Sequence, residues 1–132
     1  MPEITYALED CPTPVEVIRV FVASGLPHAL DDPAKMARLI ETADVIVCAR
    51  EDGRLVGFAR ALTDFLYTCY LSDLVVDAAC QGKGVGAELV RRVRCAAGEG
   101  VRFHLFAAPG AVTFYERLGM KRVDDAWEWP AA

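Results

Sequence analysis

The sequence predicts an α/β (α+β) fold, with one domain covering residues 1–132. Short segments rich in β-branched residues alternate with amphipathic segments of helical period. An Asp52-Gly53 step separates two of the expected strands, which is typical of a β-hairpin. Another expected strand runs into a loop with glycines at 82, 84 and 86 and then into a helix. A chain of 132 residues suits a single hydrophobic core and is too short for two.

The first third of the chain predicts a strand followed by two helices. Residues 4–8 are short and β-leaning. Thr13 and Pro14 provide the cap and the first turn of a helix, which we expect to end at Gly25. The run Asp31-Asp32-Pro33 is a second start signal, and the apolar residues after it recur at helical spacing.

The middle of the chain predicts three antiparallel strands and the helix after the glycine loop. Residues 44–50 and 55–62 form the two strands of the hairpin, with a turn at 51–53. A longer strand covers 67–76. Val85, Leu89 and Val93 then mark one face of a helix, and Gly98 is a suitable C-terminal stop.

The last third predicts a strand, a short helix and a closing hairpin. Residues 101–107 alternate as a strand does, and residues 110–118 have helical spacing. We expect residues 120–123 and 126–129 to form a terminal hairpin around Asp124-Asp125.

Composition and charge exclude several function classes. The net charge is −5, from 19 acidic and 14 basic residues, and no run of Lys and Arg is present. Non-specific binding to nucleic acid is therefore not expected, whereas a cationic amine would be tolerated. The hydrophobic fraction of 54% and the mean hydropathy of +0.24 are high for a soluble chain, and we expect a homodimer to bury the surplus.

Cysteine usage and apolar patterning indicate the compartment. The 5 cysteines are scattered without a C-x-x-C pair, which is typical of reduced thiols that fill a core. With only 2 histidines and no zinc spacing, no metal site is expected. The sequence contains no leader pattern and no apolar run long enough for a bilayer, so the predicted location is the cytoplasm, with no membrane partner.

The glycine loop has the features of an anion site. Glycines allow a close backbone approach, and the first amides of a helix have no partner within it. A P-loop requires Ser or Thr after the lysine, but Gly84 follows Lys83. A dinucleotide site requires an acidic residue near the end of the next strand, and residues 101–108 contain none. A plain glycine-rich turn with no ligand remains an alternative.

Two motifs identify a resemblance to a known family. Gln81, Gly84 and Gly86 match the pyrophosphate-binding pattern Arg/Gln-x-x-Gly-x-Gly/Ala of the GCN5-related N-acetyltransferase (GNAT) family. Residues 111–120 are similar to the helix of that family that ends in Phe-Tyr-x-x-Leu-Gly-Phe, and Tyr115 is its tyrosine. The chain resembles a small bacterial-type, single-domain member.

The resemblance implies a fold and a co-substrate. The fold is a mixed, mostly antiparallel sheet with helices on both faces, splayed between the strand before the loop and the next strand. Acetyl-CoA is expected in that gap, with its pantetheine arm on strand backbone and its pyrophosphate on loop amides. The implied binding residues are Leu74, Val75, Val76, Gln81, Gly82, Lys83, Gly84, Val85, Gly86 and Ala87.

The resemblance also implies a reaction, the transfer of acetyl to a primary amine of a small molecule or peptide by direct attack. Tyr115 would protonate the departing CoA thiolate, and a backbone N–H near Val75 or Val76 would bind the oxyanion. Asp73 is the first candidate base, because it lies on the strand that enters the site. The other candidates are Asp64, Glu128, Tyr70 and His104, and proton loss to water without a dedicated base is equally tenable.

Several positions leave the function open. The family often has Asn at position 108 and Pro at position 78, where this chain has Ala108 and Ala78, so cofactor affinity is expected to differ. His28 lies on a candidate acceptor loop, although a solvated histidine is the simpler reading. The C-terminal pattern resembles arylalkylamine-type enzymes, and Trp127 and Trp129 suit either an acceptor pocket or a dimer contact. The alternative function is a catalytically silent acyl-CoA-binding regulatory module.

Overall fold

The computed structural model describes residues 3–9, 11–26 and 31–131. His28 therefore lies outside the described residues. The elements, in chain order, are β1 (Ile4–Leu8), α1 (Pro14–Ala23), α2 (Pro33–Thr42), β2 (Val45–Glu51), β3 (Arg54–Thr63), β4 (Thr68–Val76), the 3₁₀ turn η1 (Ala78–Cys80), α3 (Val85–Ala97), β5 (Arg102–His104) and α4 (Val112–Arg117).

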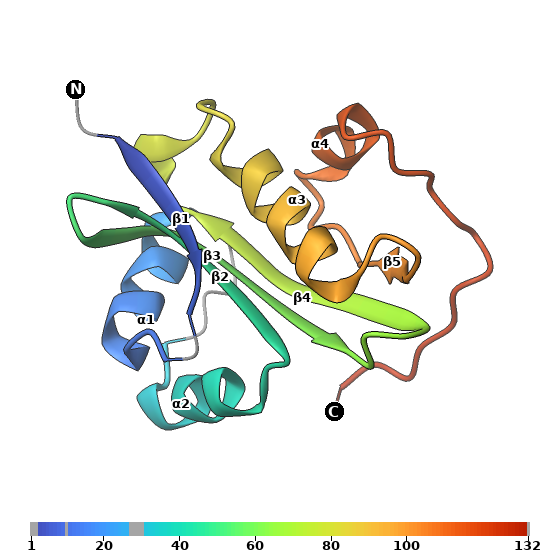
Figure 1. Ribbon diagram of the computed structural model, residues 1–132, viewed down its shortest axis with the longest axis horizontal. Coiled ribbons are helices and arrows are strands. Elements are labelled where there is room, and N and C mark those ends of the chain that lie inside the picture. Colours follow the sequence, from blue (N-terminus) through green and yellow to red (C-terminus); the bar gives the residue numbers. More distant parts are fainter. Residues whose placement is uncertain (1–2, 10, 27–30, 132) are drawn as a thin grey trace.

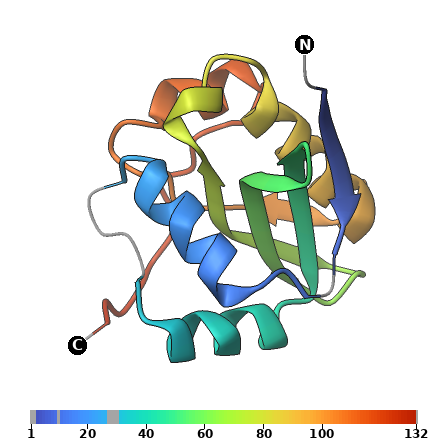
Figure 2. The ribbon, with the colours of Figure 1, turned by 90° about the vertical axis from the view of Figure 1, so that its left-hand side faces the viewer.

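The strands form one five-stranded sheet in the order β1-β2-β3-β4-β5 (Figure 1). Neighbours from β1 to β4 are antiparallel, and β4 and β5 are parallel. Helices α1 and α2 lie on one face, and α3 lies on the other (Figure 2). This arrangement confirms the predicted mixed, mostly antiparallel sheet with helices on both faces.

Side chains alternate between two cores, one on each face of the sheet. On β2, Ile46 and Cys48 pack with α1 and α2, whereas Val45 and Val47 pack with α3. All four are nearly inaccessible to solvent, so the strand reads as a continuous apolar run. The sheet is thus held rigidly from both sides, and it supplies a firm base for the loops at its edge.

The local signals at the helix and hairpin ends are confirmed. Thr13 and Glu16 form a reciprocal capping box at the start of α1. The carboxylate of Asp32 accepts from the amides of Ala34 and Lys35 at the start of α2. In the β2–β3 turn, Asp52 and Gly53 have φ of 51° and 79°, as a two-residue hairpin turn requires.

The strand expected over residues 101–107 is shorter in the structure. Only Arg102–His104 forms β5, and it pairs with Thr68–Tyr70 of β4. After His104 the backbone diverges from β4, so the residues that follow have no neighbouring strand to pair with. Pro109, which has no N–H to donate, lies in the loop that follows.

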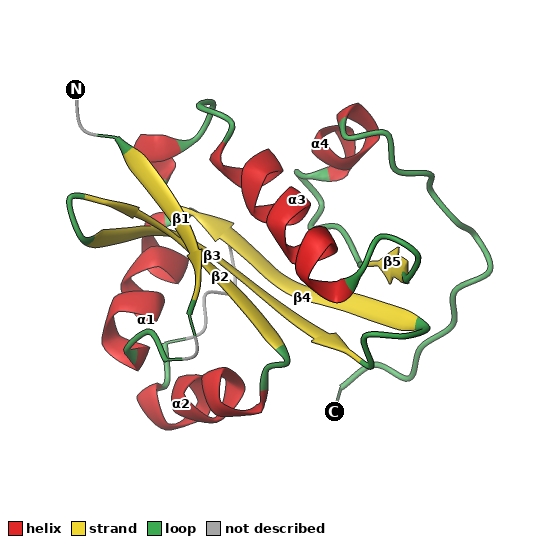
Figure 3. Cartoon of the chain, in the orientation of Figure 1, coloured by secondary structure: helices red, strands yellow, loops and turns green. Residues whose placement is uncertain are grey.

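The expected terminal hairpin was wrong. Residues 120–131 contain no helix or strand in the structure, and the chain runs as a loop from α4 to the C-terminal end (Figure 3). A two-stranded hairpin is marginal without a third strand beside it. Here β5 offers an edge of only 3 residues, so local pattern alone does not make these residues a sheet.

Gly57 allows α3 to lie close to β3, and we predict that a side chain there destabilises the fold. A Cβ at position 57 would lie 3.0 Å from Leu89 Cδ1 and 3.1 Å from Val85 Cγ1. Overpacking of this kind costs about 1–3 kcal/mol. Gly57→Val should therefore lower the free energy of unfolding by about that amount in urea titrations. Gly100→Val is the matched control, because nothing lies within 4 Å of that Cβ. Equal stability of the two variants would contradict this packing.

Candidate active site

A gap opens in the sheet where β4 and β5 separate. The two strands pair only from Thr68 to Tyr70, so the rest of β4 has no neighbour on that side. The amide of Asp77 donates to Val56 O of β3, so the backbone N–H and C=O of Asp77 point toward β3. Since backbone groups in an antiparallel pair alternate between sides, Leu74 and Val76 present theirs to the gap, and Val75 faces β3.

The loop after β4 is anchored by Asp77. Its carboxylate accepts from the Ala79 amide at 3.0 Å and pairs with Arg19 of α1 at 3.1 Å. Arg19 also donates to the carbonyl of Leu55. The Ala79 bond and the Arg19 guanidinium hold the pKa of Asp77 below its ordinary value. Helix α1, the loop and β3 are therefore joined at one buried carboxylate.

We predict that this anchor makes stability depend on acid pH. Because the folded pKa of Asp77 is lowered, its stabilisation is present above the unfolded value of about 4 and is lost as the pH falls through the folded pKa. Asp77→Asn should lower the free energy of unfolding by about 1–2 kcal/mol at pH 7. The difference from wild type should shrink below about pH 4 in denaturant titrations. The control is Asp124→Asn, in an exposed loop; a pH-independent difference would contradict the role.

Unpaired amides follow the anchor. Gly82 and Gly84 have φ of 80° and 81°, and Gly84 is the N-cap of α3 with no side-chain cap bond. The first helical bond runs from the Glu88 amide to Gly84 O. Between the Gln81 and Glu88 amides, no N–H of residues 82–87 donates a hydrogen bond to any described residue. Six successive N–H groups at a helix N-terminus thus have no partner among the described residues, which is the arrangement that an anion site requires.

Helix α4 closes the other side of this loop. A Cβ on Gly86 would lie 3.1 Å from Phe114 Cζ, so the glycine allows α4 to approach α3. Tyr115 follows on α4, with its ring edge-on to Phe114 at 5.0 Å. Tyr115 is half-buried, and burial raises the pKa of its phenol above the ordinary value of about 10. The phenol is therefore protonated, and able to donate, throughout the neutral range.

A cavity of about 570 Å³ joins the gap, the loop and α4. It brings together most of the residues implied by the resemblance: Leu74, Val75, Val76, Gln81, Gly82, Gly84, Val85, Gly86, Ala87 and Tyr115. Lys83 is exposed and does not line the cavity. Among the described residues, no Asp, Glu, Lys, Arg or His side chain is in the lining, so the unpaired amides are its main electropositive groups.

The candidate bases lie outside this lining. Asp73 pairs with Arg60, Oδ2 to Nε at 2.6 Å, and Arg60 also donates to Ser72 Oγ at 2.7 Å. Asp64 accepts three amides in the β3–β4 turn, and these bonds lower its pKa. His104 stacks on Tyr70 with ring centres 5.7 Å apart. The catalytic role of Asp73 stays a prediction, and its carboxylate is held by an arginine.

The side-chain amide of Gln81 donates to two backbone carbonyls, and its contact with pyrophosphate stays a prediction. Its Nε2 donates to Ser24 O at 3.1 Å and to Val76 O at 3.0 Å. The side chain thus links the end of α1 to the gap-facing carbonyl of β4. Arg19 and Ser24 were missed from the sequence, because each lies in or beside a helix with no motif and meets the loop only through the tertiary fold.

All 5 cysteines are free, and Cys48, Cys69 and Cys80 are buried, as expected for core thiols, whereas Cys11 and Cys95 are exposed. Burial raises the pKa of Cys48 to about 12. Within residues 3–9, 11–26 and 31–131, no group of three His, Cys, Asp or Glu side chains is placed to hold a metal. No helix among these residues is long and apolar enough to span a bilayer.

Comparison with known proteins identifies the class. Residues 15–128 match the family described as the acetyltransferase (GNAT) domain. Serotonin N-acetyltransferase 2, chloroplastic, of Oryza sativa subsp. japonica is 34% identical over 113 residues, which are 81% of this chain and 56% of that protein. The chain spans about half the length of the curated relatives that it matches.

Solved structures agree on the fold. A crystal structure from Deinococcus radiodurans R1, assigned to the acetyltransferases, is 31% identical with a TM-score of 0.77, covering 96% of this chain and 87% of that one. The aminoglycoside N-acetyltransferase AAC(6')-Iy in complex with CoA has a TM-score of 0.75 over 99% of this chain and 96% of that one. At 17% identity, that second likeness shows the fold alone.

The chain belongs to the GNAT family of acetyltransferase enzymes, a family that uses acetyl-CoA. The family membership predicted from Gln81, Gly84, Gly86 and the Tyr115 helix is confirmed. The ligand contacts of individual residues remain predictions, and so do the acceptor, the compartment and the oligomeric state.

Proposed function

We propose that this chain transfers an acetyl group from acetyl-CoA to a primary amine. The observation that carries the proposal is the row of free amides at residues 82–87, which opens on the gap between β4 and β5. A diphosphate carries several acceptor oxygens, and charge-assisted bonds to it contribute about 1.5–3 kcal/mol each. None of the described lining residues carries a carboxylate, so none of them repels that anion.

The pantetheine arm would lie along the open edge of β4. Leu74 and Val76 present backbone groups to the gap, and an extended arm with amides can pair with them as an added strand does. Gln81 already donates to Val76 O, so the arm would take the carbonyl of Leu74 or displace the Gln81 amide. This placement directs the thioester toward Tyr115, which lines the same cavity.

The reaction would proceed by direct attack. The amine nitrogen forms a bond to the thioester carbonyl carbon, the C–S bond breaks, the amine loses a proton, and the thiolate of CoA gains one. Val76 N–H faces the gap, so it is the better candidate than Val75 N–H for binding the oxyanion. Tyr115, protonated throughout the neutral range, would donate to the departing thiolate.

The amine would lose its proton to water. None of the described lining residues carries a carboxylate or an imidazole, and Arg60 binds Asp73. His28 lies outside the described residues. An ammonium must lose its proton before attack because it has no lone pair. We therefore expect the rate to rise with pH as the free amine becomes more abundant, without a separate enzyme group that limits it on the acid side.

The acceptor we favour is an arylalkylamine. Tyr70 stacks on His104 and meets Phe106 edge-on with ring centres 6.1 Å apart. Cys69 and Leu71, the neighbours of Tyr70, pack toward α3, so this aromatic group lies on the opposite face of the sheet. An aromatic ring attached to a primary amine would stack there. The relative named serotonin N-acetyltransferase 2 supports the same class.

Thiol release in the presence of amines tests the proposal. Tryptamine and phenylethylamine should release free CoA thiol faster than hexylamine, an aminoglycoside or a lysine peptide. Tyr70→Ala with Phe106→Ala should raise KM for the aryl amines and leave acetyl-CoA binding unchanged. Faster turnover of a non-aromatic amine would contradict the acceptor class only. Acetyl-CoA binding without release for the whole panel would instead support a silent regulatory module.

The compartment is also part of the proposal. The pattern of the sequence predicts the cytoplasm, whereas two of the curated relatives carry the word chloroplastic in their names. Fractionation of cells that make the protein would decide between these places.

A further inference from the structure

A second cavity of the molecule lies beside the acetyl-CoA site proposed above. It is a groove of about 700 Å³ between α3, β5 and residues 118–121, which follow α4. Among the described residues, the two linings share only Gly84 and Ala87, and Tyr115 lies outside the groove. Small-molecule sites usually have volumes of about 300–1,000 Å³. The groove is therefore a separate candidate binding site, which the transfer reaction does not use.

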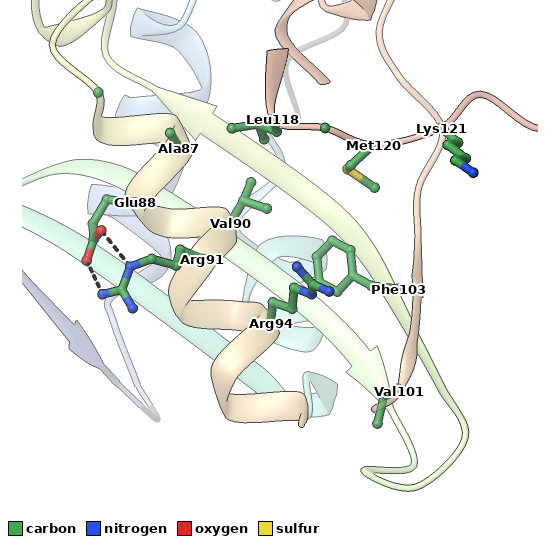
Figure 4. A pocket seen from close by; sticks show the side chains of 12 residues that line it. Ala87, Glu88, Val90, Arg91, Arg94, Val101, Phe103, Leu118, Met120 and Lys121 are labelled. Atoms are coloured by element: carbon green, nitrogen blue, oxygen red, sulfur yellow. Dashed lines mark hydrogen bonds and ion pairs between the residues drawn. The ribbon is translucent and has the colours of Figure 1, made fainter. Parts of the chain in front are cut away.

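The floor of the groove is apolar. Val90 of α3 and Val101, directly before β5, belong to the buried core on this face of the sheet. Phe103 of β5 and Met120 are partly buried. Figure 4 shows the side chains of Val90, Phe103 and Met120 pointing into the groove. Because methionine adapts to irregular shapes, this floor suits a flexible apolar chain.

Two cations on the walls of the groove have no ionic partner. Arg94 lies on the α3 wall, and Lys121 lies on the wall formed by residues 118–121. Neither is in an ion pair within the described residues. A few charged groups beside an apolar floor are the usual arrangement of a small-molecule site, in which they bind and orient the ligand.

A carboxylate in the lining, that of Glu88, is already bound. Its Oε2 accepts from Arg91 Nη2 at 2.7 Å and from Arg92 Nε at 2.6 Å, and Figure 4 shows the pair with Arg91. The bonds from Arg91 and Arg92 lower the pKa of Glu88 to about 2, so Glu88 is ionised and paired at neutral pH. Arg94 and Lys121 therefore remain as the charges that a ligand would meet, and they favour an anion.

We propose that this groove is a binding site for an amphipathic carboxylate. The apolar chain would lie on Val90, Phe103 and Met120. The carboxylate would bind the two unpaired cations on the walls. The lining follows α3 from Gly84 to Arg94, which is about 15 Å by the helical rise and suits a chain of about ten carbons.

The nucleotide end of CoA suits the groove less well. A diphosphate needs several donors together, and these are the unpaired amides of residues 82–87. Of these residues, only Gly84 and Ala87 line the groove. The rest of its surface offers an apolar floor and single cations, which match one anionic head on an apolar chain.

Titration of the full-length chain with octanoate, in the absence of acetyl-CoA, tests the site. We expect saturable shifts of the amides of residues 88–94, Phe103 and Lys121 in ¹H–¹⁵N NMR spectra. Affinity should rise by up to about fourfold for each methylene from hexanoate to decanoate, because each methylene is buried on the floor. Octyltrimethylammonium, which has the same chain and a cation, should bind at least about tenfold more weakly.

Three results of this titration would overturn the proposal. They are the absence of saturable binding by octanoate and decanoate, equal affinity for octyltrimethylammonium, and binding of adenosine 3′,5′-bisphosphate at these amides in place of octanoate. The last result would assign the groove to a nucleotide.

Charge reversal locates the carboxylate. Arg94→Glu with Lys121→Glu should weaken octanoate binding by at least about tenfold and should make octyltrimethylammonium the better ligand. This inversion requires a folded groove, so loss of structure cannot imitate it. Lys35→Glu with Arg38→Glu is the matched control, because both residues are exposed on α2 and neither lines the groove. An unchanged preference in the groove variant, or an equal loss in the control, would contradict the site.

Discussion

Gly84→Glu should weaken acetyl-CoA binding by at least about a hundredfold, or below detection in calorimetry. Gly84 is the N-cap of α3 with φ of 81°, and its Cβ would point into open space beside the free amides. A glutamate there brings a carboxylate to the site of a diphosphate. Repulsion replaces charge-assisted bonds of about 1.5–3 kcal/mol each.

The control for Gly84→Glu is Gly53→Glu. Gly53 has φ of 79° and also has nothing within 4 Å of its Cβ, so the backbone strain is matched. It lies in the β2–β3 turn and does not line the cavity. We expect normal acetyl-CoA binding by this variant. Gly84→Ala adds the strain without the charge and should weaken binding only modestly. Normal binding by Gly84→Glu would show that the pyrophosphate lies elsewhere.

Tyr115→Phe should lower kcat by about 10²–10⁴-fold and leave the acetyl-CoA dissociation constant unchanged. The phenylalanine keeps the edge-on contact with Phe114, so packing is preserved. The hydroxyl alone is lost, and with it the donor to the CoA thiolate. Tyr67→Phe, at an exposed tyrosine of the β3–β4 turn, is the control and should be neutral. A turnover number within twofold of wild type would exclude Tyr115 as the acid.

The pH dependence of the wild-type rate should also report the protonation state of Tyr115. The acid must be protonated, and burial raises the pKa of Tyr115 above about 10. The rate at saturating acetyl-CoA should therefore rise with pH as the amine loses its proton and should fall only above about pH 10. In Tyr115→Phe the alkaline fall should be absent. A fall that persists in the variant would assign it to another group.

Local signals predicted much of the fold. Thr13 with Pro14, Asp32 with Pro33, and Asp52-Gly53 each satisfy a backbone requirement within a few residues, and each is found where it was expected. The glycine loop was predictable for the same reason. A helix that starts at a glycine has no side-chain cap, so its first amides stay unpaired. The residues of the loop alone are enough to predict this.

Features set by tertiary pairing were predicted less well. The length of β5 depends on where β4 leaves it, and residues 101–107 alternate regularly beyond that point. The terminal hairpin failed because β5, at the edge of the sheet, offers residues 120–129 only 3 residues to pair with. The anchor at Asp77 required Arg19, which is 58 residues away and carries no motif. Asp73 was predicted as a base because it lies on the strand that enters the site. Its ion pair with Arg60 could not be predicted, because Arg60 lies on the neighbouring strand β3.

The most direct test of the central claim is the response of individual backbone amides to CoA in an ¹H–¹⁵N NMR titration of the full-length chain. We predict that the amides of residues 82–87 and the gap-facing amides of Leu74 and Val76 show the largest shift changes, because they gain acceptors. If the largest changes occurred instead around Arg94, Phe103 and Lys121, or if no amide moved at millimolar CoA, the loop at the start of α3 would not be the cofactor site.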